Sequence, residues 1–421
     1  MYESRRSYAG MSIVATIAAI ALPLTLSAQG GGADWPCWRG PERNGISRET
    51  GWTHPWGATG PTVLWRAALG KGFSSFAVAE GRAYTLGNTD NTDTVFCLDA
   101  ASGKTLWQHH YPCELQPLSY EGGPSATPAV DQGRVFTLSK SGDLFCFDAV
   151  SGNILWTKKF NLWPWLEGDW KNTWRYAGSP LVMGDRLILS IGQWGLALKV
   201  QDGSLIWASP VGHPGYSSPV PYRSAAGTAA LVFFSGHALV GVDAEAGRPL
   251  WKLPWNTLWD LNAADPILHD GRLLVSSGNN VGCALFDVAA DPPRELWRHK
   301  NLRTPMNGAV LWQNCVFGFD ETRFVCLDWT TGQVRWEKPD LRRGSLILAE
   351  AKLILLDERG KLAILAASGD GYRPLAEATV LSGRCWTTPV LAHRRLYVRN
   401  AVGDAVCLDA GAGAGPAVGG P

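Results

Sequence analysis

Short runs of alternating apolar and polar residues recur along the chain, and small or charged residues interrupt them after a few positions. Residues 95–99 (VFCLD) and 105–107 (TLW), for example, flank a turn at residues 100–104. A side-chain period of two, broken by turns that contain Gly and Asp, predicts β-hairpins. Another pair of short strands precedes each hairpin, as at residues 76–79 and 82–86. Each unit is therefore predicted to be a four-stranded meander.

The last hairpin of most units carries one phrase, in which an Asp is followed after four residues by a Gly and after four more by a Trp. The Asp side chain can hydrogen-bond to turn amides, and the Gly allows a positive φ. We interpret the Trp as a large flat residue that fills the joint between neighbouring units, and therefore as structural. The residues assigned to this docking role are Trp65, Trp107, Trp156, Trp207, Trp251, Trp297 and Trp336, with Asp99, Asp148, Asp243 and Asp328 and with Gly103, Gly152, Gly203, Gly247 and Gly332.

Successive docking tryptophans are 39 to 51 residues apart, which is typical of the blades of a β-propeller. Residues 345–375 repeat the strands without the Trp, and residues 386–409 stop after three strands. Residues 61–69 (PTVLWRAAL) form a strand that contains the Trp but has no hairpin before it. Pairing the two ends would leave no open sheet edge. We therefore predict an all-β fold, an eight-bladed β-propeller of four-stranded antiparallel blades, with the ring closed by strand 61–69 as part of the last blade.

The two ends of the chain differ from the repeats. Residues 1–28 have two arginines, an apolar run at 11–26 and a small residue at the expected cleavage point, which predicts a cleaved signal peptide. A membrane anchor is the alternative, but the run contains Pro23 and is shorter than the ~20 residues that span a bilayer. We expect a periplasmic or secreted protein with no stable membrane span. The remaining domain assignments are an N-terminal extension at 29–60, a single propeller domain at 61–410 and a flexible Gly/Ala tail at 411–421.

Composition narrows the classes of partner. The 38 basic and 37 acidic residues nearly cancel, so no overall field would hold a nucleic acid. The nine cysteines include no Cys-x-x-Cys pair and no Cys/His grouping at zinc spacing, so haem and zinc have no support. An odd number leaves at least one thiol unpaired. The candidates for disulfides are Cys37, Cys113, Cys315 and Cys385, and the sequence does not indicate which of them pair.

The repeated Asp-x-x-x-Gly-x-x-x-Trp phrase resembles the tryptophan-docking repeat of the pyrroloquinoline quinone (PQQ) propeller superfamily, over about residues 34–410. That superfamily includes the quinoprotein alcohol dehydrogenases and the non-enzymatic propeller lipoprotein of the outer-membrane assembly machinery. The segments 34–45 (DWPCWRGPERNG), 326–338 (CLDWTTGQVRWEK) and 383–393 (GRCWTTPVLAH) are similar to secreted PQQ-like repeat proteins of planctomycete-type bacteria. The resemblance implies the propeller fold and leaves the activity open.

The quinoprotein enzymes differ from this chain in two respects. They carry a vicinal Cys-Cys disulfide beside the cofactor, whereas no two cysteines are adjacent here. They also have long loop insertions around the substrate pocket, whereas the blades here are short. No catalytic or metal-binding residue is therefore carried over from the resemblance, and we expect neither PQQ nor calcium to be bound.

Loops that lead from the outer strand of one blade to the inner strand of the next cross the ring at the mouth of the central channel. A ligand site is expected there. These loops contain tryptophans that the repeat does not explain: Trp163, Trp165, Trp170 and Trp174 in the longest loop, with Trp255, Trp259 and Trp386. The candidate ligand-binding residues at the channel mouth are Glu121, Trp174, Arg175, Tyr176, Tyr216, Asn262, Asp265, Asn307, Arg343 and Trp386.

Three functions agree with this pattern. The first is an exported scaffold that binds a protein, a small molecule or a carbohydrate at the channel mouth, without PQQ and without catalysis. The second is a PQQ- and calcium-dependent oxidoreductase like the alcohol dehydrogenases, in which Glu121, Asp265, Asn262 and Asn307 would offer oxygen ligands to calcium. The third is a carbohydrate-binding propeller that stacks sugars on the tryptophans of loop 160–176. The structural alternative for these tryptophans is a self-packed loop that covers the channel.

Overall fold

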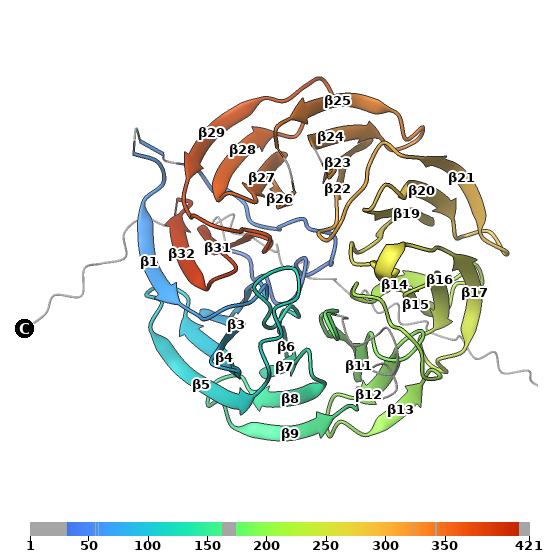
Figure 1. Ribbon diagram of the computed structural model, residues 1–421, viewed down its shortest axis with the longest axis horizontal. Helices are drawn as coiled ribbons and strands as arrows, with labels where there is room; N and C mark the ends of the chain where they lie inside the picture. Colours follow the sequence, from blue (N-terminus) through green and yellow to red (C-terminus); the bar gives the residue numbers. More distant parts are fainter. Residues whose placement is uncertain are drawn as a thin grey trace, which may run out of the picture.

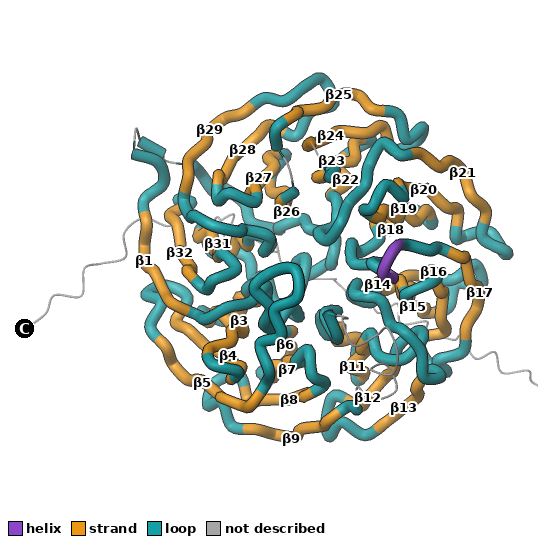
Figure 2. Tube along the Cα trace, viewed as in Figure 1, coloured by secondary structure: helices purple, strands orange, loops and turns teal. Residues whose placement is uncertain are grey.

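The computed structural model describes residues 32–54, 56–57, 59–161, 174–321, 323–341 and 343–411. In this part of the chain, 32 strands form eight four-stranded antiparallel sheets, arranged as blades around a central channel (Figure 1). The predicted all-β, eight-bladed propeller is confirmed. Helical structure in the same residues consists of one 3₁₀ turn, η3 (Leu258–Asp260) (Figure 2). None of the described residues form a helix long and apolar enough to cross a membrane. The predicted signal peptide (1–28), the tail beyond Gly411, and Trp163, Trp165 and Trp170 lie outside the described residues.

Each blade is built from an inner to an outer strand. Blades 1 and 2 contain β2 (Ala77–Ala79), β3 (Arg82–Thr89), β4 (Thr92–Asp99) and β5 (Thr105–Pro112), then β6 (Ala129–Asp131), β7 (Arg134–Leu138), β8 (Asp143–Asp148) and β9 (Ile154–Lys159). Blades 3 and 4 contain β10 (Leu181–Met183), β11 (Arg186–Leu189), β12 (Leu196–Lys199) and β13 (Leu205–Ala208), then β14 (Val220–Arg223), β15 (Ala229–Phe234), β16 (Ala238–Asp243) and β17 (Pro249–Pro254). Blades 5 and 6 contain β18 (Ile267–His269), β19 (Arg272–Ser277), β20 (Gly282–Asp287) and β21 (Arg294–His299), then β22 (Val310–Trp312), β23 (Cys315–Phe319), β24 (Arg323–Asp328) and β25 (Val334–Pro339). Blades 7 and 8 contain β26 (Gly344–Ala349), β27 (Lys352–Asp357), β28 (Lys361–Ala366) and β29 (Pro374–Thr379), then β30 (Val390–Ala392), β31 (Arg395–Arg399), β32 (Asp404–Asp409) and β1 (Val63–Ala68).

The hydrophobic pattern of a strand depends on its position within the blade. A third strand such as β28 lies between neighbouring blades, so both of its faces are buried and its sequence, KLAILA, is almost continuously apolar. An outer strand such as β29 exposes one face to solvent, and its burial alternates residue by residue. The core therefore lies in the joints between blades rather than in one central cluster.

The ring closes where the N-terminal strand meets the C-terminal one. Strand β1 pairs antiparallel with β32, with Trp65 opposite Cys407, and completes blade 8 as predicted. At the joint between blades 8 and 1, the guanidinium of Arg399 is fully buried and donates to the carbonyl oxygens of Leu86 at 2.6 Å and Gly70 at 2.8 Å. Burial lowers the pKa of Arg399 to about 10. Backbone dipoles therefore hold a cation at this joint.

The docking tryptophans connect each blade to the next. The indole of Trp107 in blade 1 lies over Gly152 of blade 2, and its Nε1–H donates to the carbonyl oxygen of Ala149 at 3.1 Å. Trp251 is an exception because its Nε1–H donates to the hydroxyl of Tyr222 in its own blade at 2.8 Å. The turn of the next blade has Asp291 four residues after Asp287, where five other turns have Gly103, Gly152, Gly203, Gly247 and Gly332. The remaining five donate to the carbonyl oxygens of Ala100 (from Trp65), Val200 (from Trp156), Ala244 (from Trp207), Trp329 (from Trp297) and Ser368 (from Trp336).

The turn that receives the indole is held by the Asp and the Gly of the repeated phrase. Asp148 Oδ1 accepts hydrogen bonds from the amide and the hydroxyl of Ser151, both at 2.8 Å, and these bonds lower the pKa of Asp148. Gly152 follows with a φ of +74°, in the left-handed region that a residue with a Cβ rarely adopts. Because Gly152 has no side chain, the indole can lie against the turn itself.

The N-terminal extension enters the central channel, a position that the sequence pattern did not predict (Figure 1, dark blue). On the way in, Trp35 exchanges two backbone hydrogen bonds of 2.8 Å with Val78 of β2, and the carbonyl of Pro36 accepts from Val130 of β6 at 2.8 Å. On the way out, Ile46 forms a parallel bridge with Leu348 of β26. We call residues 33–52 the N-terminal plug.

A buried carboxylate holds both ends of the plug, at the face of the ring opposite the loops that join neighbouring blades. Glu49 is almost completely buried, and its carboxylate accepts from the backbone amides of Ala33 and His393, both at 2.8 Å, and of Arg394 at 3.1 Å. His393 and Arg394 form the β30–β31 turn. This turn lies at one end of the inner strand β30, and the loop that leads into β30 from blade 7 lies at the other end. Both ends of the plug are thus held together on one face of the ring.

We expect replacement of Gly152 by alanine to destabilise the joint between blades 1 and 2 by two effects. The new Cβ would lie 2.6 Å from Cδ2 of Trp107, and the residue would keep a φ of +74°. The matched control is Gly133→Ala, since Gly133 has a φ of +71° but no atom within 4 Å of the new Cβ. Backbone strain alone costs roughly 1–2 kcal/mol, and the displaced indole adds about 1–3 kcal/mol. Urea unfolding of both variants measures the difference, and equal losses would contradict the indole contact.

Candidate functional site

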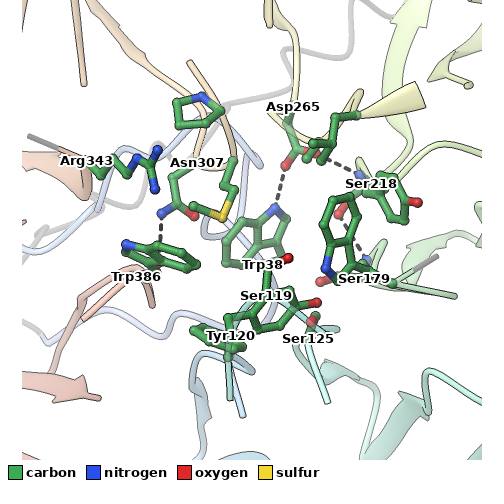
Figure 3. A pocket seen from close by; sticks show the side chains of 18 of the residues that line it. Trp38, Ser119, Tyr120, Ser125, Ser179, Ser218, Asp265, Asn307, Arg343 and Trp386 are labelled. Atoms are coloured by element: carbon green, nitrogen blue, oxygen red, sulfur yellow. Dashed lines mark hydrogen bonds between the residues drawn. The ribbon is translucent and has the colours of Figure 1, made fainter. Parts of the chain in front are cut away.

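A cavity of about 340 Å³ opens at the mouth of the channel. Its wall contains residues from all eight crossover loops, the loops that join each outer strand to the next inner strand, together with Asn279 of the β19–β20 turn and Trp38 of the plug (Figure 3). The crossover residues are Phe73, Ser119, Tyr120, Ser125, Trp174, Ala177, Ser179, Tyr216, Ser218, Leu261, Ala263, Asp265, Pro305, Met306, Asn307, Arg343, Arg384 and Trp386.

Five aromatic side chains form a continuous arc along half of the wall. They come from the crossover loops that lead into blades 8, 1, 2, 3 and 4, in that order. Neighbouring ring centroids are 5.8 Å apart for Trp386 and Phe73, 5.1 Å for Phe73 and Tyr120, 6.1 Å for Tyr120 and Trp174, and 5.5 Å for Trp174 and Tyr216. These separations are typical of interacting aromatic pairs, so the arc is a packed surface.

Asp265 connects the arc to the plug at the floor of the cavity (Figure 3). One carboxylate oxygen accepts from the backbone amide of Ser218 at 2.7 Å, and the other accepts from the indole Nε1–H of Trp38. Burial raises the pKa of Asp265, and the nearby guanidinium of Arg39 opposes that effect. Arg39 is itself buried and donates to the carbonyl oxygen of Ala309 at 2.7 Å. The carboxylate therefore fastens two segments of the chain to each other.

Two arginines lie against Trp386 on the other side of the cavity. The guanidinium carbon of Arg384 is 4.5 Å from the ring centroid and that of Arg343 is 5.9 Å from it. Arg384 forms an ion pair with Glu121 at 2.8 Å. Arg343, in contrast, is exposed, and its guanidinium has neither an ion pair nor a hydrogen bond with any of the described residues. Within the part of the chain that the structure describes, this region of the wall therefore presents one cation that has no counter-charge.

Asn307 places an amide beside this cation. Its Nδ2 donates to the carbonyl oxygens of Trp386 at 2.7 Å and Gly344 at 3.2 Å, which fixes the orientation of the side chain. Its Oδ1 receives no hydrogen bond from the residues that the structure describes. A bound molecule could thus donate to Asn307 and place an anionic group against Arg343.

Six of the ten predicted ligand-binding residues lie in the cavity wall: Trp174, Tyr216, Asp265, Asn307, Arg343 and Trp386. The other four lie behind it. Glu121 pairs with Arg384, and Arg175 donates to the hydroxyl of Ser141 at 3.2 Å. Tyr176 is buried in the joint between blades 2 and 3. Asn262 is fully buried and donates to the carbonyl oxygens of Ser235 and Gly236.

The extra tryptophans outside the docking column have different positions. Trp174 and Trp386 belong to the arc, whereas Trp255 is buried between blades 4 and 5 and donates to the hydroxyl of Ser277 at 3.0 Å. Trp259 is 69% exposed on η3 and does not line the cavity. Trp38 lines the cavity, but sequence reasoning missed it because its segment precedes the first blade and belongs to no repeat.

The residues that the alternative oxidoreductase hypothesis offers to calcium do not form a donor set. Asn262 Oδ1 accepts from the hydroxyls of Thr257 and Ser277, and both oxygens of Asp265 accept from other parts of the chain. Glu121 is paired with an arginine. Among the described residues, no three His, Cys, Asp or Glu side chains are grouped so that they could hold a metal. All nine cysteines lie in described residues and are free thiols, including the four that were candidates for disulfides. These residues do not fit the calcium and quinone hypothesis.

Comparisons with known proteins identify several similar chains. A family model described as outer membrane protein assembly factor BamB matches residues 91–338. BamB of Burkholderia pseudomallei (strain K96243) is 25% identical over 361 residues, which cover 80% of this chain and 84% of that protein. The solved structure of BamB from Moraxella catarrhalis has a TM-score of 0.61 and 18% identity, over 83% of this chain and 99% of that one. Quinohemoprotein alcohol dehydrogenase from Comamonas testosteroni has a TM-score of 0.66 and 13% identity, over 92% and 82%. At these identities the two solved structures show likeness of fold.

A half-buried histidine, His213, packs against Tyr216 of the aromatic arc. The rings of His213 and Tyr216 are 5.4 Å apart, and His213 Nδ1 accepts from the backbone amide of Gly215 at 3.2 Å. Burial lowers the pKa of His213 to about 4, and the neighbouring His237 contributes to the shift. In the unfolded chain, the pKa of a histidine is about 6.5.

This difference predicts a loss of stability in weak acid. Between pH 6.5 and 4 the unfolded chain binds a proton that the folded state does not, so the free energy of unfolding falls as the pH decreases through this window. In the natural chain this proton uptake is expected to lower the free energy of unfolding by about 2 kcal/mol between pH 7 and pH 4.5, and His213→Gln is expected to remove that loss. The control is His110→Gln, because His110 is exposed. Urea unfolding at pH 7 and at pH 4.5 measures the effect, and an unchanged pH dependence in His213→Gln would assign the loss to other groups.

Proposed function

Because this chain belongs to the family of the outer membrane protein assembly factor BamB, we propose that it is an exported, non-catalytic scaffold that binds its ligand or partner in the aromatic cavity. The observation that carries this proposal is the convergence of all eight crossover loops on one cavity whose wall contains a continuous aromatic arc. A wall of this kind is typical of binding surfaces, where large rigid rings provide contact area at low entropic cost.

The cavity favours a ligand with two chemically different parts. The arc from Trp386 to Tyr216 offers a curved apolar surface to a flat or apolar group. Arg343 and the free Oδ1 of Asn307 lie at one end of this arc and favour an anionic group that also carries a donor. Apolar contact would supply most of the affinity, and the charge pair would fix the orientation.

The location and the type of partner are part of the same proposal. The predicted signal peptide supports export, and the Burkholderia pseudomallei relative is named as an outer membrane protein assembly factor. That name also supports a protein as the partner, with the cavity receiving one of its side chains or a short segment.

The two alternative functions have weaker support. For an oxidoreductase, Glu121, Asn262 and Asp265 are engaged with other groups of the chain, and the likeness to the alcohol dehydrogenase at 13% identity concerns the fold alone. For carbohydrate binding, Trp174 and Trp386 are suitably placed in the wall, but the apolar arc and the unpaired Arg343 favour an anion over a neutral sugar.

The proposal can be tested with 8-anilinonaphthalene-1-sulfonate, a probe that combines aromatic rings with an anionic group. We expect one probe molecule to bind per chain, detected by fluorescence and by isothermal titration. Trp386→Ala and Arg343→Ala together are expected to weaken binding by at least about tenfold, because they remove an aromatic contact and the unpaired cation. The control is Arg373→Ala, which removes an exposed arginine that is paired with Asp370 on the outer surface.

Two outcomes would contradict the proposal. The first is probe binding that Trp386→Ala and Arg343→Ala leave unchanged, since the cavity would then not be the site. The second is tight one-to-one binding of PQQ in the presence of calcium, together with dye-linked oxidation of an alcohol. Fluorescence quenching by neutral glycans at the same site, without probe binding, would favour the carbohydrate alternative instead.

A further inference from the structure

We propose that the N-terminal plug is part of the ligand site, with Trp38 as a ligand-contacting residue, and that cavity occupancy and docking of the plug stabilise one another. The inference rests on the proposed function, because it concerns the same cavity. It adds a binding residue from outside the repeat and a coupling between the two faces of the ring.

The path of the plug brings one side chain to the cavity. The chain enters beside the β30–β31 turn, runs along β2 and β6, and reverses in a tight turn before it returns along β26. The amide of Gly40 donates to Cys37 at 3.0 Å and that of Gly45 donates to Arg39 at 2.9 Å, so the reversal is hydrogen-bonded. Trp38 lies within this reversal, at the point of the plug that reaches the cavity.

The indole of Trp38 is held from one edge and is open on another side. Its Nε1–H donates to Asp265, and Trp38 is only half-buried although the next residue, Arg39, is buried. Figure 3 shows Trp38 between Asp265 and the ring of Tyr120, in the middle of the cavity residues. A ligand that fills the cavity therefore meets Trp38 as its floor.

Asp265 makes the floor and the wall one unit. The same carboxylate binds Trp38 of the plug and the backbone amide of Ser218, in the crossover loop that also carries Tyr216 of the arc. If the plug withdrew, one oxygen of a buried carboxylate would lose its donor and the cavity would lose its floor. The plug and the wall are therefore expected to be ordered together.

Coupling follows from mass action. A ligand that contacts Trp38 binds the state with a docked plug and not the state with an open one, so it lowers the open population by the factor 1 + [L]/Kd. At a concentration of probe 100 times its Kd, opening of the plug is expected to become about 100-fold rarer. The effect would extend to Glu49, at the other face of the ring.

Hydrogen exchange of the full chain tests the coupling without any substitution. The reporters are plug amides that are hydrogen-bonded within the channel: Trp35, Arg43, Gly45 and Ser47. We expect their exchange to slow by about 100-fold when 8-anilinonaphthalene-1-sulfonate is present at about 100 times its Kd. Amides of the outer strand β29 serve as the internal control and are expected to be unaffected.

Variants of two plug tryptophans test the contact. Trp38→Ala is expected to weaken probe binding by at least about tenfold, and Trp38→Phe by less, since it keeps a ring but loses the bond to Asp265. The matched control is Trp52→Phe, at the other end of the plug, where the indole is buried and Lys352 Nζ is 4.4 Å from the ring centroid. This control is expected to bind the probe like the natural chain.

The outcomes separate the two proposals. Probe binding that depends on Trp386 and Arg343 but not on Trp38, or that leaves the exchange of the plug amides unchanged, overturns the plug proposal and leaves the proposed function intact. The absence of probe binding in the cavity overturns both. If Trp38→Ala fails to fold, Trp38→Phe and the exchange experiment on the natural chain still decide.

Discussion

Every blade presents its inner strand to the central channel, and the backbone groups of that strand need hydrogen-bond partners that water supplies poorly in a narrow space. The N-terminal plug provides such partners to three inner strands: Trp35 bonds to Val78 of β2, the carbonyl of Pro36 accepts from Val130 of β6, and Leu348 of β26 accepts from Ser47 and donates to the carbonyl of Gly45. Filling the channel also closes it beneath the crossover loops. The cavity is consequently a blind pocket with a floor, and its depth depends on a segment outside the repeats.

The sequence could predict the ring because the ring is made of local, repeated chemistry. Each Asp holds its own turn, each Gly leaves room for an indole, and the short Trp strand at 61–69 has one place in a closed ring, as β1 shows. The plug is different, because its contacts are single and distant in sequence. Arg39 donates to Ala309 and Trp38 donates to Asp265, and no period or motif connects these pairs. Such contacts become visible when the fold is known.

The candidate site was only partly predictable for a related reason. The crossover loops could be located from the repeat, and so could the aromatic arc that they carry. Within one loop, however, some side chains point to the cavity and others into the joints between blades. Trp174 lines the cavity whereas Tyr176, two residues later, is buried in a joint, and Asn262 is bound to carbonyl groups of a neighbouring turn. Residue type does not distinguish these directions, because both environments accept aromatic and amide groups.

The face that carries Glu49 has a practical consequence. The described chain enters the ring there at Ala33, which Glu49 holds, and it ends at Gly411 beside Thr53, where Ala410 donates to Arg394 of the same β30–β31 turn. Both described ends thus lie on the far side of the ring from the cavity. A surface coating, a biosensor chip or a fusion partner attached through either end would therefore leave the aromatic pocket directed outward, so that many copies in a layer would present the same binding face to solution.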